Sequence, residues 1–116
     1  MKIVKTSREF TKQEQYLMTM SPTLKMVNHV EDGETLNVSG YLTYTDTQSD
    51  GAEVEILSVI GLDKAGNVDI WACQSRTFKE SFGNLASIFG DEEFTIVKIS
   101  GETKAGRSYV NCDLAH

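Results

Sequence analysis

Four side chains in this sequence belong to the types that bind transition metals: Cys73, Cys112, His29 and His116. Structural zinc sites are usually built from pairs of ligands at short spacing, such as Cys-x-x-Cys or His-x-x-x-His. The four residues stand far apart in the chain and form no such pair. Two thiols in a chain without a secretion signal are more often reduced core residues than a disulfide. The sequence therefore predicts no metal site.

The two histidines also lack the neighbours that catalysis requires. A nucleophile needs a general base within hydrogen-bond reach and a third group that orients this base. No residue close to His29 or His116 in the sequence offers that arrangement. The chain also contains no phosphate-binding loop, no dinucleotide fingerprint and no His-Glu-x-x-His motif. We therefore expect a protein that is not an enzyme and holds no cofactor.

Three aromatic side chains are better placed to bind a ligand: Tyr41, Trp71 and Tyr109. Each lies in a predicted strand, at the parity opposite to the aliphatic residues of that strand. If the aliphatic residues fill a core, the three rings point outward. Outward rings can stack on nucleobases, and each stacked base contributes ~1–3 kcal/mol. The alternative for each ring alone is that the N-terminal segment or a partner subunit covers it.

Four basic residues lie near these rings and could hold the phosphates of a nucleic acid. They are Arg76 after the third strand, Lys98 in the fourth, Lys104 in the last turn and Arg107 beside Tyr109. For Lys104 and Arg107, a solvated hairpin tip is the plainer interpretation. The aromatic and basic residues together make up a candidate nucleic-acid-binding set.

The hydrophobic pattern predicts the elements that position these residues. Between residues 35 and 115 it indicates three strands, one helix and two further strands. We expect the strands at residues 35–45, 53–61, 68–73, 93–101 and 107–115. This order is that of the five-stranded OB barrel, whose sheet face and loops bind oligonucleotides or oligosaccharides. The expected fold class is mainly β, an OB-like barrel with one helix between its third and fourth strands.

The predicted helix begins after Ser75, a plausible N-cap, and ends at Gly90. Its apolar residues recur at spacings of four, three and four, which is typical of a helix with one buried face. They are Phe78, Phe82, Leu85 and Phe89. We expect this stripe to plug the barrel.

Residues 1–33 have a different texture and are predicted to form a partly helical extension that packs on the domain of residues 34–116. Thr11 and Glu14 match a capping box, which predicts a short helix behind them. Ser21 and Pro22 end that helix and suit the start of a second one. The sheet edges and the apolar extension make a homodimer plausible, because pairing or covering an edge removes an aggregation hazard.

The formal net charge is −6 at pH 7, which argues against simple binding of a polyanion. The acidic residues are concentrated in residues 34–63, which carry six acids and no base. A basic surface elsewhere on the molecule is compatible with this distribution, so the charge alone excludes neither a nucleic-acid ligand nor a protein ligand. No stretch reaches the roughly 18 apolar residues of a membrane span, so we expect a cytoplasmic protein without membrane contact.

The stretches at residues 75–82, 94–101 and 103–107 share a further feature, which also extends to residues 44–46 and 55–58. They resemble the small single-stranded DNA-binding proteins of phages and mobile elements in Gram-positive bacteria. It implies an OB-like domain that coats single-stranded DNA during replication in the host cytoplasm, without cutting DNA or hydrolysing a nucleotide. Replication or recombination proteins would be its further partners.

The first hypothesis is therefore a sequence-tolerant single-stranded DNA-binding protein, acting in phage or plasmid replication or recombination. In this hypothesis the three aromatic residues stack bases and the four basic residues hold phosphates. The alternative is an OB-like protein-interaction module, an adaptor or an acidic mimic of nucleic acid, that binds no DNA. The negative net charge favours this alternative.

Overall fold

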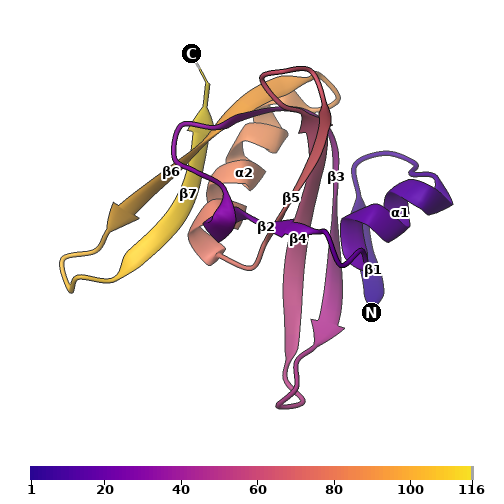
Figure 1. Ribbon diagram of the computed structural model, residues 1–116, viewed down its shortest axis with the longest axis horizontal. Coiled ribbons are helices and arrows are strands. Elements are labelled where there is room, and N and C mark those ends of the chain that lie inside the picture. The colour runs from indigo at the N-terminus through magenta and orange to yellow at the C-terminus, as the bar shows by residue number, and fades with distance from the viewer. Residues whose placement is uncertain (116) are drawn as a thin grey trace.

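The computed structural model describes residues 1–115, so the candidate metal ligand His116 lies outside the described residues. The described chain contains two α-helices, and its strands form a single connected sheet (Figure 1). The elements are β1 (Lys2–Thr6), α1 (Lys12–Thr19), β2 (Lys25–Met26), the 3₁₀ helix η1 (Val27–His29), β3 (Thr35–Thr47), β4 (Glu53–Leu62), β5 (Val68–Cys73), α2 (Arg76–Phe89), β6 (Phe94–Glu102) and β7 (Ser108–Leu114). Neither α-helix is long and apolar enough to cross a membrane.

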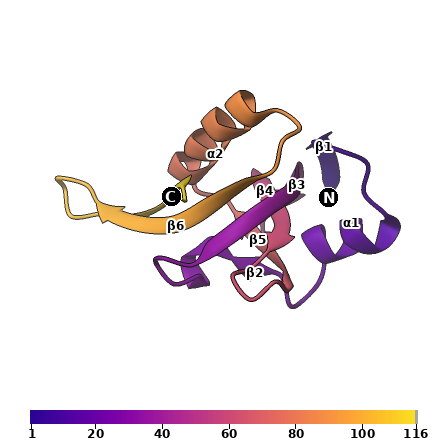
Figure 2. The same cartoon turned by 90° about the horizontal axis from the view of Figure 1, so that it is seen from above.

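The sheet has seven strands in the order β2-β5-β4-β3-β6-β7, and β1 pairs with β3. It curls around α2 as an open half-barrel (Figures 1 and 2). The prediction of a mainly β, barrel-like fold is confirmed, but the strand count of five is wrong. The N-terminal segment contributes β1 and β2, so α2 lies between the fifth and sixth strands. Because β2 already pairs with β5 at Trp71 and Ala72, this edge of β5 is not free to pair with β7 and close the barrel.

A bulge in β3 divides its side chains between two cores. The pairing of β3 with β4 shifts between Val38 and Gly40, so one extra residue is inserted and the alternation of side chains inverts. Leu36 and Val38 therefore pack in the core around α2. Leu42 and Tyr44 pack on the opposite face of the sheet. Regular alternation along residues 35–45, without a bulge, would place all four residues on one face.

The core of the half-barrel is built around α2. Ser75 caps the helix by accepting a hydrogen bond from the Phe78 N–H, and Gly90 ends it at φ 61°. Phe78 and Phe82 are buried against the concave face of the sheet. The predicted helix, its caps and its plugging role are confirmed.

The N-terminal segment covers the outer face of β3, β4 and β5. Thr11 and Glu14 form both hydrogen bonds of the predicted capping box at the start of α1. Met18 of α1 and Phe10 before it are buried on this face. The helix expected after Ser21 and Pro22 does not form, because the chain there turns into β2 and joins the sheet.

Candidate nucleic-acid interface

The most prominent projection of the molecule is the hairpin of β6 and β7, which extends away from the half-barrel (Figures 1 and 2). We call residues 99–111 the β6–β7 arm. Its strands stay in register up to the pair Glu102 and Ser108. The turn is closed by hydrogen bonds between Thr103 and both Gly106 and Arg107, and Gly106 takes a φ of 81°. The arm is therefore a regular hairpin with a tight, hydrogen-bonded tip.

Tyr109 lies flat on the arm because its cross-strand partner is a glycine. Tyr109 pairs with Gly101, and a Cβ atom at position 101 would collide with the tyrosine ring. The ring remains 36% exposed, and Ile99 beside it is also exposed. Since one side of the ring rests on the β6 backbone, its position is fixed while part of it faces solvent. Such a ring can stack on a nucleobase.

The opposite face of β7 packs against α2. Cys112 is buried there, and its thiol lies 4.0 Å from the carbonyl oxygen of Phe78. Burial raises the pKa of the Cys112 thiol to about 12 and that of Cys73 to about 11. Both thiols are protonated at neutral pH, and neither forms a disulfide. Among residues 1–115, no three His, Cys, Asp or Glu side chains are grouped so that they could hold a metal ion.

Two cations flank the tip of the arm. Lys104 and Arg107 are exposed, and within residues 1–115 neither forms a salt bridge. Glu102 is the one acidic residue among residues 99–111. The arm is therefore net basic in a chain whose total charge is −6.

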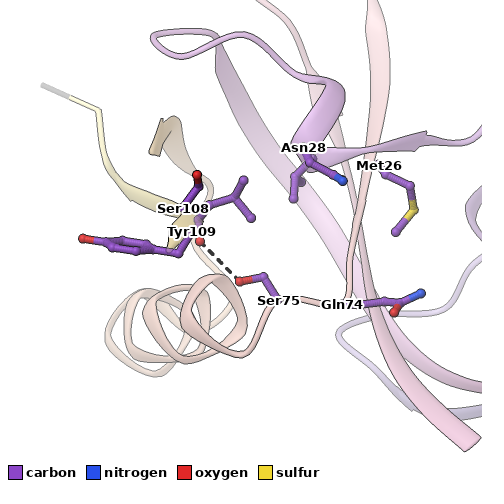
Figure 3. A pocket seen from close by; sticks show the side chains of 8 residues that line it. Met26, Asn28, Gln74, Ser75, Ser108 and Tyr109 are labelled. Carbon is purple, nitrogen blue, oxygen red and sulfur yellow. Dashed lines mark hydrogen bonds between the residues drawn. The ribbon is translucent and has the colours of Figure 1, made fainter. Parts of the chain in front are cut away.

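A hollow of about 510 Å³ lies beside the arm, between β7 and the segment of β2 and η1 (Figure 3). It occupies the place where a closed barrel would pair β5 with β7. Figure 3 shows Asn28 and Gln74 on one side of the hollow and Ser108 on the other, while the ring of Tyr109 points away from it. Ser75 Oγ donates a hydrogen bond of 3.3 Å to the Val110 carbonyl oxygen at the same place. The amides and hydroxyls around the hollow could bond to polar edges of a ligand.

Along half of the free edge of β7, side chains of the same strand accept hydrogen bonds from the backbone N–H groups. Because the Ala115 N–H bonds to Thr95 on β6, the N–H groups of Cys112 and Leu114 point toward the free edge. The side-chain oxygens of Asn111 and Asp113 accept these two hydrogen bonds at 2.9 and 2.8 Å. Pairing of another strand along this half is therefore disfavoured. The open part of the edge is the part that borders the hollow.

No family model, curated protein or solved structure matches this chain. The assignment of a ligand to this surface therefore depends on the physical properties of its residues.

Arg76 is the third predicted cation at this end of the molecule. It follows Ser75, which borders the hollow, and its side chain is 91% exposed. Its guanidinium lies 3.0 Å from Glu80 one turn along α2. Exposed pairs of this kind contribute little to stability, so the pair does not prevent Arg76 from binding a phosphate.

The prediction that Trp71 points outward is wrong. Its side chain is 1% exposed in the core around α2, and its indole N–H donates to Asp69 over 3.1 Å. The residues of β5 that face away from this core are Ile70 and Ala72, which pack under the N-terminal segment. Trp71 cannot stack on a base while it stays buried in this core.

Tyr41 also lies elsewhere than predicted. Because the bulge inverts the alternation in β3, Tyr41 turns toward α2, and its ring meets that of Phe82 edge-on at 5.0 Å. It is half-buried and lies apart from the residues that line the hollow beside the arm. The structure therefore does not bring Tyr41 together with Tyr109.

Lys98 is held inside the molecule, contrary to the expectation that it faces a ligand. Its side chain is 6% exposed, and its Nζ bonds to Asp32 at 2.7 Å and to Ser100 at 3.0 Å. Ser100 also donates to Asp32. The Lys98 bond, with a smaller contribution from Ser100, holds the pKa of the Asp32 carboxyl below its usual value. The hydrogen bonds among Asp32, Lys98 and Ser100 thus hold the loop before β3 against β6.

The sequence interpretation missed Gly101 and the polar residues around the hollow, Asn28 and Gln74. Gly101 could have been found, because pairing Thr103 with Arg107 across the turn places it opposite Tyr109. The hollow could not, because it depends on β2 occupying the edge of β5.

Proposed function

We propose that this protein binds single-stranded DNA with little sequence preference and without catalysis. Its place would be phage or plasmid replication or recombination in the host cytoplasm. The observation that carries the proposal is the Tyr109 ring seated on Gly101, on an arm with two exposed cations. The resemblance of residues 75–82, 94–101 and 103–107 to phage single-stranded DNA-binding proteins supports the same ligand.

In this proposal a strand crosses the arm. Lys104 and Arg107 neutralise phosphates, one base stacks on Tyr109, and Arg76 meets the strand at the far side of the hollow. Stacking tolerates any base because every base has a π-face, so such a site has little sequence preference. The polar groups of the hollow would bond to whichever base edge reaches them.

The acidity of the rest of the chain sets the expected behaviour. Three cations release few counterions, so the logarithm of the binding constant should fall with the logarithm of the salt concentration with a slope of about −2. A homodimer, which we also propose, would place two arms on one strand and raise the apparent affinity without new contacts.

Fluorescence anisotropy of labelled oligo-dT at low and raised salt tests this function. We expect Tyr109→Ala to weaken binding roughly tenfold, a loss within the range for one stacked base. Tyr16→Ala is the matched control, because Tyr16 is an exposed tyrosine on α1, away from the arm. If the folded protein binds no oligo-dT at low salt, the proposal is wrong.

A protein-interaction module is the second candidate, and one observation favours it. In OB folds the face of the second and third strands commonly carries the ligand. Here the outer face of β4 and β5 is buried under the N-terminal segment. An acidic mimic would bind a basic DNA-binding protein and displace labelled oligo-dT from it, whereas a DNA-binding protein would take up the oligonucleotide itself. The same anisotropy measurement distinguishes the two.

A further inference from the structure

A second hollow of about 510 Å³ lies on the concave side of the sheet, between α2 and strand β1. We call it the α2–β1 groove. One wall is formed by residues 79–87 of α2 and the other by Val4 and Lys5 of β1. Tyr41, Leu57 and Phe82 give it a largely apolar floor. None of its residues borders the hollow beside the β6–β7 arm.

Strand β1 leaves an unpaired edge beside this groove. It pairs with β3 from Lys2 to Thr6 with a bulge between Ile3 and Lys5, and among residues 1–115 its other edge pairs with no strand. The Ser7 N–H bonds to the Tyr41 carbonyl oxygen, so by alternation the N–H and C=O of Thr6 point toward the free edge. An exposed edge of this kind is a template for an added strand from another chain.

The helix wall of the groove is flat because of Gly83. A glycine inside a helix is less favourable for stability than an alanine. Nothing within residues 1–115 requires it, because a Cβ atom at Gly83 would meet none of their atoms within 4 Å. Ala86 and Ser87 extend the same wall with small side chains. Such a wall allows a further backbone to approach α2 closely.

The charge around the groove is opposite to that of the whole chain. Residues 1–12 carry four basic residues and one acid, whereas the net charge of the protein is −6. Lys5 lines one wall and Lys79 the other, and Glu55 is the one acidic residue of the lining, which is therefore net basic. Lys79 donates one hydrogen bond to the Glu55 carbonyl oxygen and keeps two further N–H donors for a ligand. The charge is complementary to a ligand that carries carboxylates.

We propose that the α2–β1 groove docks an extended peptide of a partner protein in which the side chains on one face of the strand, at every second position, are apolar and acidic. The peptide adds a strand to the free edge of β1. Its apolar side chains enter the groove, and its carboxylates meet Lys5 and Lys79. A nucleic acid fits this surface less well, because it has no peptide N–H and C=O groups to pair with a strand edge. The inference does not rest on the proposed DNA binding.

A library of random octapeptides, selected on the immobilised full chain, tests the proposal without knowledge of the partner. We expect enrichment of sequences in which positions i, i+2 and i+4, which share one face of a strand, carry apolar residues together with Asp or Glu. A selected peptide is then labelled with fluorescein and titrated with the protein. Methylation of alternate amide nitrogens in the peptide should abolish binding, because it removes the hydrogen bonds to β1.

Two substitutions with matched controls place the site. Gly83→Leu places a side chain in the groove, and its Cβ atom meets no atom of residues 1–115 within 4 Å, so it should weaken peptide binding tenfold or more. The matched control is Asn84→Leu at the neighbouring exposed position, which should change peptide binding less than twofold. Lys5→Glu should weaken binding by a similar factor, and Lys64→Glu, in the exposed β4–β5 turn, should not. Circular dichroism confirms that each variant is folded.

Three results would overturn the inference. These are enrichment of no sequence or of basic sequences, peptide binding that Gly83→Leu leaves unchanged, and oligo-dT binding that Gly83→Leu abolishes. The last result would assign the groove to nucleic acid. Tyr109→Ala separates the two proposals, because it should weaken oligo-dT binding and leave peptide binding intact.

Discussion

Ser75 joins the start of α2 to the free edge of β7. Its hydroxyl accepts a hydrogen bond from the Phe78 N–H and donates one to the Val110 carbonyl oxygen. A single side chain thus caps the helix that fills the core and holds the strand that carries Tyr109. Because the barrel does not close by pairing β5 with β7, this bond bridges the gap that the closure would have sealed.

Ser75→Ala should lower the free energy of unfolding by about 1–2 kcal/mol, because it removes the helix cap and the bond to Val110. Urea unfolding measures the loss. Ser75→Thr keeps the hydroxyl and should stay close to the parent protein. Amide exchange at Phe78 should accelerate in Ser75→Ala alone, and equal exchange in both variants would show that the cap contributes nothing.

Gly101→Ala should displace the Tyr109 ring, because the added Cβ atom would collide with it. In the parent protein the ring should shift the Gly101 Hα resonance upfield in the proton NMR spectrum, and the shift should vanish in Tyr109→Ala. If Tyr109 stacks on DNA, Gly101→Ala should also weaken oligo-dT binding several-fold. The double variant should then bind no more weakly than Tyr109→Ala, since the two residues act as one unit.

Trp71 should report on the core and not on a ligand. Its fluorescence should be resistant to acrylamide, and oligo-dT should not quench it by stacking, because the ring is buried. Trp71→Ala should cost about 3–5 kcal/mol of stability through the cavity that it leaves. Trp71→Phe should cost less, since an aromatic ring still fills part of the space, although the hydrogen bond to Asp69 is lost. Strong acrylamide quenching in the native state would contradict the burial.

The elements of residues 35–114 could be predicted because local patterns specify them. Each of these patterns involves residues that are close in the sequence. They are the polar turn at residues 103–106, the cap at Ser75 and the stripe of Phe78 and Phe82. The direction of Tyr41 could not be predicted in the same way. It depends on a bulge at Ser39, and the bulge places Gly40 where a side chain would strike Arg8 and Phe10 of a distant segment.

Trp71 shows the second limit of the sequence pattern. Both faces of β5 are buried, one by α2 and the other by the N-terminal segment. When both faces are apolar, alternation does not distinguish the inside from the outside. The outward direction of Tyr109 could be predicted, because β7 has only one buried face and the register of its hairpin fixes the other.

The Asp32–Lys98 pair should contribute stability that depends on pH. The bonds from Lys98 and Ser100 lower the pKa of the Asp32 carboxyl. Its contribution is therefore present above the ordinary pKa of 3.8 and is lost as the pH falls through the lowered value. Asp32→Asn should reduce the urea midpoint at pH 7 and flatten its decline below pH 4. An unchanged midpoint at pH 7 would show that burial of Lys98 needs no partner.

The two thiols should destabilise the protein at alkaline pH. Burial raises their pKa from an ordinary 9.0 to about 11 for Cys73 and about 12 for Cys112, so the folded state holds its protons more tightly than the unfolded state. The stability that the protonated thiols contribute is therefore fully present below pH 9 and is lost as the pH rises from 9 through the raised thiol pKa values. The double variant Cys73→Ala and Cys112→Ala should lose less stability over that range in urea titrations. Both proteins keep Tyr44, whose pKa burial also raises, so its contribution cancels in the comparison.

The burial of the two cysteines can also be checked by their reactivity. In the native parent at pH 8 a thiol reagent should react slowly with both residues, and rapid reaction would mean that the core around α2 opens at this pH.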